Sequence, residues 1–240
     1  MRFLIGSVAI LASCSAIFAV SPDTRAFEQQ ISDALECVRD ILVSGLPDQG
    51  LPSFNPLEIP SILICHGSIA IEDLYLAGVT NFKQSNIKGT VGLIPPRYTL
   101  QLTLTFPLTS LKTKYDFDVS YSPSNSHIYG AGEFGLEAVN AAADLDLTAT
   151  ILGGIAVNNF DLWISLQGLN SFSLTGLYND EECSAKLVEA VPADPSGVVA
   201  SYAQAIHDIA SDVVVGAVGS GALEGDGLVS TIMDQCINLK

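Results

Sequence analysis

The chain has 240 residues, with 26 Asp and Glu against 10 Lys and Arg, so its formal net charge is −16. Nucleic acids, anionic lipid headgroups and lipopolysaccharide all require a basic surface, and the charge balance therefore argues against each of them as a partner. The mean hydropathy is positive, at +0.40, and the acidity also has the simpler explanation that it keeps an apolar chain in solution.

The N-terminal segment, residues 1–19, has the pattern of a secretory signal peptide. Arg2 supplies the positive charge, an apolar stretch follows, and small residues lead to Ala19 as the expected cleavage point. The apolar stretch is too short to span the ~30 Å hydrocarbon layer, which argues against a transmembrane anchor. We therefore expect a secreted, extracellular protein without stable membrane insertion, with one domain over residues 20–240.

Residues 27–42 carry apolar side chains at helical spacing, which predicts an amphipathic helix. The apolar stripe consists of Phe27, Ile31, Leu35, Val38 and Leu42. Gly45 follows at the position where a C-cap glycine is expected. Residues 46–60 then contain four prolines, which predicts an extended connector without regular structure.

Residues 66–178 are patterned as strands. The alternation is clearest over residues 98–106, where Tyr98, Leu100, Leu102, Leu104 and Phe106 are separated by polar residues. A period of two predicts a sheet with one apolar and one polar face. Because the connections between successive strands are short, we expect an antiparallel meander of about six to eight strands.

Helical spacing returns over residues 198–233, with Asp194 and Pro195 as the expected N-cap and first helical residue. Glycines between positions 216 and 227 interrupt the pattern, so we expect two C-terminal helices or one broken helix. A sheet with one apolar face needs a cover, and helices at both ends of the chain can provide it. The fold class expected is α+β.

Four cysteines remain after removal of the expected signal peptide, and an even number in a secreted chain suggests two disulfide bonds. They are Cys37, Cys65, Cys183 and Cys236. Three pairings are possible. We favour Cys37–Cys65 with Cys183–Cys236, since each of these bonds ties a terminal helix to neighbouring chain.

The sequence contains no pattern that predicts catalysis, a cofactor or a metal site. His66, His127 and His207 are far apart, without ligands at metal spacing, and no nucleophile elbow is present. The carboxylates of residues 116, 118, 144 and 146 occupy the polar phase of their strands, which is typical of a solvated face. Trp163 also falls in the polar phase; it is either an exposed contact for a membrane or partner, or a cap for the sheet edge against a loop.

Two segments resemble a known family. Residues 55–60 read NPLEIP, and residues 74–82 read LYLAGVTNF. Both resemble segments of the arthropod takeout and juvenile-hormone-binding proteins and of the related group 7 mite allergens. The resemblance implies a long, strongly curved antiparallel sheet wrapped around a C-terminal helix, with an N-terminal helix, as in half of a tubular lipid-binding super-roll. It also implies an internal apolar tunnel for a terpenoid, fatty acid or other lipid.

The apolar side chains that face inward either fill a solid core or line such a tunnel, and the alternation alone leaves both possibilities open. The candidate lining residues are Leu100, Leu102, Leu104, Phe106, Phe117, Val119, Leu147, Leu162, Ile164 and Ile206. With the resemblance, the function expected is a secreted, non-enzymatic carrier of a small apolar ligand. The alternatives are a surface-interaction protein of the bactericidal permeability-increasing class, a structural or partner-binding protein with a filled core, and a secreted hydrolase.

Overall fold

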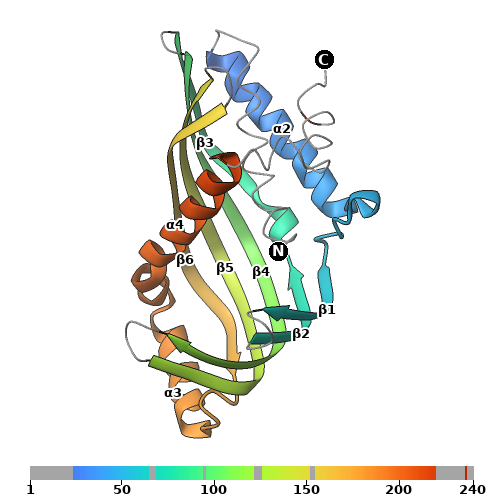
Figure 1. Ribbon diagram of the computed structural model, residues 1–240, viewed down its shortest axis with the longest axis vertical. Helices are drawn as coiled ribbons and strands as arrows, with labels where there is room; N and C mark the ends of the chain where they lie inside the picture. Colours follow the sequence, from blue (N-terminus) through green and yellow to red (C-terminus); the bar gives the residue numbers. More distant parts are fainter. Residues whose placement is uncertain are drawn as a thin grey trace.

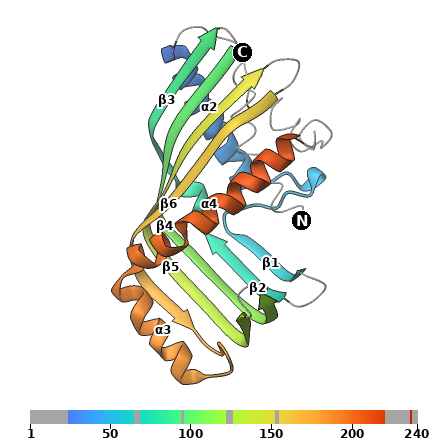
Figure 2. The same ribbon diagram turned by 60° about the vertical axis from the view of Figure 1, so that its left-hand side comes forward.

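The computed structural model describes residues 24–64, 69–93, 96–121, 126–151, 155–219 and Cys236. It consists of one strongly curved antiparallel sheet of six strands with helices from both ends of the chain (Figures 1 and 2). The elements are α2 (Thr24–Ser44), the 3-10 helix η2 (Pro47–Gln49), β1 (Leu57–Ile64), β2 (Ile69–Ala77), the 3-10 helix η4 (Val79–Asn81), β3 (Lys83–Leu93), β4 (Pro96–Tyr121), β5 (Ser126–Ile151), β6 (Ile155–Leu174), α3 (Glu181–Ala193) and α4 (Pro195–Gly219). The α+β fold class and the long curved antiparallel sheet are therefore confirmed.

The strand order is β1-β2-β4-β5-β6, and β3 pairs with β4. Because β5 occupies one edge of β4, β2 and β3 must share the other. β3 pairs with β4 as far as Thr105, and β2 pairs with it from Ser110 onward. The short helix η4 connects β2 to β3, so it interrupts this edge at the middle of the sheet.

The apolar alternation changes phase along the two longest strands. In β4, apolar residues occupy even positions up to Phe106 and odd positions from Leu111. The register places Pro107 opposite Asn140, but the two do not pair, and Asn140 has a left-handed φ of 49°. Asn140 donates a hydrogen bond to Gln167 of β6 at 3.1 Å, so the irregularity continues into the third strand. Because the alternation shifts by one residue at this unpaired position, both halves of β4 can present apolar side chains to the same face of the sheet.

α2 covers part of this face, as its apolar stripe predicts. Its C-terminus is capped by Gly45, which has a φ of 72° and donates its N–H to the Ile41 carbonyl at 2.7 Å. Two groups of buried residues contain α2 side chains. The sheet cluster consists of Ile31, Ala34, Leu35, Phe82, Leu100, Leu102, Leu145, Leu147, Ala149 and Phe160. The connector cluster consists of Val38, Ile41, Leu42, Leu51, Phe54, Leu57 and Cys236. We call the face bearing the sheet cluster the inward face.

The C-terminal region contains two described helices. α4 begins at Pro195, and the Asp194 carboxylate accepts the Gly197 N–H at 2.9 Å, which confirms the predicted cap. α4 runs along β6 and contributes Ala210 to the packing against the sheet cluster. α3 was not predicted; its N-terminus is capped by Asp180, and it packs on β6 (Figure 2). Residues 220–235, with most of the predicted glycine interruption, lie outside the described residues. None of the described helices is both long and apolar enough to cross a membrane.

The favoured disulfide pairing is wrong. Cys37 of α2 is bonded to Cys236, 199 positions away, with their Cα atoms 5.4 Å apart. Both residues lie in or against the connector cluster, so packing between the two ends of the chain decides the pairing, not proximity along the sequence. Among the described residues, Cys183 in the first turn of α3 is a free thiol, and Cys65 lies outside them.

The position of η4 depends on Gly78. Gly78 has a φ of +87°, and a Cβ atom there would lie 2.0 Å from the Leu108 carbonyl oxygen of β4. We expect Gly78→Ala to lower the free energy of unfolding by roughly 2–3 kcal/mol, because the strained φ and the backbone clash add together. Gly50 is the matched control, since its φ is +72° but a Cβ would meet no atom within 4 Å. Gly50→Ala should cost only about 1 kcal/mol in urea unfolding; equal losses for the two variants would contradict a close contact between η4 and β4.

Candidate functional site

The inward face holds six of the ten candidate lining residues in one region. Leu100, Leu102 and Leu147 are buried members of the sheet cluster. Leu104, Phe106 and Leu162 are half-buried and pack against it. The sequence alternation thus identified a continuous apolar surface between α2 and α4, in which some side chains are fully packed and others retain exposed area.

The other four candidates lie outside both clusters. Phe117 and Val119 are half-buried near the far end of β4, where the Phe117 ring stacks on Tyr115 with their centroids 4.9 Å apart. Tyr115 is buried, its hydroxyl donates to the Thr175 carbonyl, and burial raises the pKa of that phenol. Ile164 of β6 and Ile206 of α4 are half-buried.

Cross-strand register reveals a feature that the alternation alone did not show. Deep in the sheet cluster, large side chains meet across all three strands, as in the row Leu100–Leu147–Phe160. Toward the bend, the central strand carries alanine while its neighbours keep large side chains. These rows are Leu104–Ala143–Ile164 and Phe106–Ala141–Leu166, and all six residues are half-buried. We call Ala141 and Ala143 the alanine pair. The run of three alanines at 141–143 is visible in the sequence. It points to a site only once the larger partners in β4 and β6 are known.

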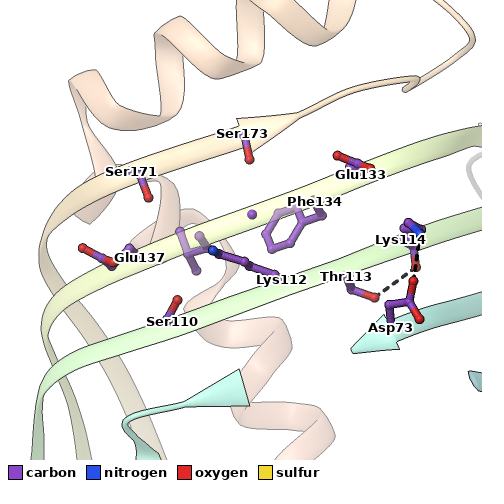
Figure 3. A pocket seen from close by; sticks show the side chains of 12 residues that line it. Asp73, Ser110, Lys112, Thr113, Lys114, Glu133, Phe134, Glu137, Ser171 and Ser173 are labelled. Atoms are coloured by element: carbon purple, nitrogen blue, oxygen red, sulfur yellow. Dashed lines mark hydrogen bonds and ion pairs between the residues drawn. The ribbon is translucent and has the colours of Figure 1, made fainter. Parts of the chain in front are cut away.

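The opposite, outer face of the sheet is polar. A groove of about 350 Å³ lies on this face. Ser110 and Lys112 of β4, Glu137 of β5, and Ser171 and Ser173 of β6 contribute side chains to it (Figure 3). At one end of the groove, the Lys114 ammonium lies 2.8 Å from the Asp73 carboxylate, and this hydrogen bond raises the pKa of Lys114. Within the described residues, no group of three or more His, Cys, Asp or Glu side chains could hold a metal ion.

Trp163 lies in a second groove on the outer face, beside Asp144 and Asp161. Its ring stacks on His207 of α4, with centroids 5.0 Å apart and planes 11° apart, and the His207 Nδ1 accepts the Leu162 N–H at 3.5 Å. Trp163 therefore covers the edge of β6, as one of the two expectations had it, but against a helix and not a loop. The side chain also stays 45% exposed.

The strand carboxylates are mostly solvated, as the alternation predicted. Asp116, Asp118 and Asp144 are exposed, and half-buried Asp146 accepts a hydrogen bond from Gln101 at 2.8 Å. Asp118 also lies 2.6 Å from the Nε2 of His127. These pairs hold neighbouring strands together on the outer face.

Comparison with known proteins identifies the family. The family model described as "Haemolymph juvenile hormone binding protein (JHBP)" matches residues 6–220. No curated protein matches the chain. Among solved structures, the chain is similar to Takeout 1 of Epiphyas postvittana, with 15% sequence identity, a TM-score of 0.45, and coverage of 75% of this chain and 86% of that chain. Since the family model spans most of the sequence, the chain belongs to the haemolymph juvenile hormone binding protein family.

Proposed function

We propose that the protein is a secreted, non-enzymatic carrier that binds a small apolar ligand on the inward face of its sheet. The observation that carries this proposal is the alanine pair, whose small side chains lie in register between larger, half-buried side chains of β4 and β6. From this difference in size we infer an apolar depression on the inward face at the alanine pair. Family membership supports the same conclusion.

The exposure of the side chains on the inward face supports ligand binding at the alanine pair. Leu100 and Leu147 are almost completely buried by packing within the protein, so they offer little area to a ligand. Leu104, Phe106 and Ile164 point to the same face but remain half-buried. Apolar side chains with unburied area gain free energy when a ligand removes that area from water.

The area involved is sufficient for useful affinity. Burying ~400 Å² of apolar ligand surface at ~25 cal/mol/Å² gives ~10 kcal/mol before association costs. After these costs, dissociation constants from micromolar to nanomolar are expected. Diffuse apolar contacts of this kind need no catalytic residue and fit a carrier.

Three observations support secretion. Residues 1–19 have the pattern of a signal peptide. The bond between Cys37 and Cys236 is typical of proteins that fold in an oxidising compartment. The family description places its members in haemolymph.

Solvent extraction of the protein purified from its source tests the carrier function directly. We expect mass spectrometry of the extract to reveal an apolar molecule in near-stoichiometric amount, and the extracted protein to bind the fluorescent apolar probe N-phenyl-1-naphthylamine. An extract without lipid, together with a failure to bind the probe, would favour a filled core and contradict the proposal.

Filling the depression tests where the ligand binds. Ala143→Leu should weaken probe binding by about tenfold, because leucine takes the space between Leu104 and Ile164. Its free energy of unfolding should change by less than about 1 kcal/mol, whereas overpacking of a filled core costs ~1–3 kcal/mol. The matched control is Ala142→Leu, which is in register with Thr105 and Ser165 on the outer face and should bind the probe normally. Normal binding by Ala143→Leu, with a clear loss of stability, would show that this part of the face is packed solid.

A further inference from the structure

The second groove of the outer face, which we call the Trp163 groove, combines an aromatic wall with a polar floor. Lys88 of β3 lines it on one side and Trp163 of β6 on the other. Between them, the register aligns the shorter side chains of Thr103 on β4 and Asp144 on β5 with Trp163. The groove has a volume of about 480 Å³, which lies within the ~300–1,000 Å³ of small-molecule sites.

The Trp163 ring is held in place but only partly covered. His207 stacks on one face of the indole, with the two centroids 5.0 Å apart. Since the residue stays 45% exposed, its exposed area belongs mainly to the other face and the edges of the ring. A fixed, flat apolar surface in a polar groove suits the C–H face of a sugar ring, whose hydroxyls point to the sides.

The polar side chains of the Trp163 groove offer both acceptors and donors. The Asp144 carboxylate accepts the Thr103 hydroxyl at 2.6 Å, and the Asp146 carboxylate accepts the Gln101 amide at 2.8 Å. These bonds orient the carboxylates, and an ionised carboxylate has two acceptor oxygens, so each can accept further hydrogen bonds. The exposed Lys88 adds an ammonium donor. Because a sugar hydroxyl both donates and accepts, it can pair with either kind of group.

The charges in the Trp163 groove favour an uncharged ligand. The carboxylates of Asp144, Asp146 and Asp161 would repel an anion. A cation would meet the ammonium of Lys88, and the carboxylates already have neutral donors, including the Asn159 amide, which donates to Asp161 at 2.7 Å. A neutral polyhydroxyl ligand can form hydrogen bonds with all of these groups without the desolvation cost of an ion.

We propose that the Trp163 groove is a second binding site, which takes a neutral sugar that stacks on Trp163 and forms hydrogen bonds with Asp144, Asp146 and Lys88. The groove lies on the opposite face of the sheet from the alanine pair, so this inference stands independently of the carrier function. Each hydrogen bond to the sugar replaces one to water, and the expected dissociation constant is therefore about 1 mM.

Trp163 is the only tryptophan in the chain, so its fluorescence reports directly on the groove. The test titrates maltose, cellobiose and lactose separately into the wild-type protein. We expect at least one of these sugars to change the tryptophan emission saturably, and the affinity to be the same at low and high salt, because the ligand is uncharged.

Variants locate the binding within the groove. Asp146→Ala should bind the same sugar about tenfold more weakly, because it removes a charged acceptor. Asp116→Ala is the matched control, since it removes an exposed carboxylate of β4 that lies outside the groove and should bind the sugar normally. Trp163→Ala lacks the reporter, so isothermal titration calorimetry measures its affinity, which should also fall about tenfold or more. Thermal unfolding of each variant shows that it is folded.

The absence of a saturable change with all three sugars would overturn the proposal, as would equal affinities of the wild type and Asp146→Ala. If arginine amide changed the tryptophan emission and the sugars did not, the groove would be a cation site and the sugar proposal would be wrong. The carrier function would stand in each of these cases, because it depends on the inward face.

Discussion

Replacing Cys37 and Cys236 together by alanine should lower the free energy of unfolding by about 4–5 kcal/mol, which is the largest effect expected from any change considered for this protein. The bond closes a loop between residues 199 positions apart, so the oxidised unfolded chain has far fewer conformations than the reduced one. Urea unfolding without reductant measures the loss directly, and the midpoint of thermal unfolding should fall by roughly 10–15 °C.

Cys183→Ala is the matched control, because this cysteine is a free thiol in α3. It should change the free energy of unfolding by less than about 0.5 kcal/mol. A double variant at positions 37 and 236 that unfolds like the wild type would mean that the bond does not form in the folded protein. A large loss from Cys183→Ala would mean that this thiol has a partner in the folded protein.

Truncating Leu100 should have the second largest effect. Leu100 is completely buried in the sheet cluster, together with Ile31 of α2 and Leu147 of β5. Leu100→Ala should therefore cost about 3–5 kcal/mol in the absence of any ligand, through lost apolar transfer and the cavity left behind. Leu108→Ala, on the same strand, is the control; Leu108 is 46% exposed and its truncation should cost less than about 1 kcal/mol.

The same variant separates a core role for Leu100 from a role in lining the ligand site. If Leu100 is core, Leu100→Ala loses stability, while the folded fraction binds N-phenyl-1-naphthylamine with unchanged affinity. If its side chain lines the site, affinity falls along with stability. A loss of less than about 1 kcal/mol would contradict tight packing at this position.

Much of the fold follows from local sequence patterns. The period-two alternation of residues 98–106 correctly placed a strand with one apolar face, and the stripe from Ile31 to Leu42 correctly placed α2. Gly45, Asp194 and Pro195 marked helix ends because their local chemistry is specific to those positions. α3 was missed because most of its side chains are exposed and form no apolar stripe of the kind that α2 has.

The features that could not be predicted depend on contacts between distant parts of the chain. The partner of Cys37 is fixed by packing between the N-terminal helix and the C-terminal end, which local spacing cannot reveal. The apolar alternation changes phase at Pro107, so the sequence predicted two separate strands there. The structure has one strand of 26 residues, β4, in which Pro107 lies opposite Asn140. The alanine pair becomes informative only when its cross-strand neighbours are known.

The link between Cys37 and Cys236 also makes the two halves of α2 unequal. Cys37 lies in the C-terminal half of α2, so that half is covalently tethered to the far end of the polypeptide. The N-terminal half is held instead by packing, with Ile31 and Ala34 buried in the sheet cluster. A reductant would therefore release the staple at one end of this helix and leave the packing of its other end on the sheet intact.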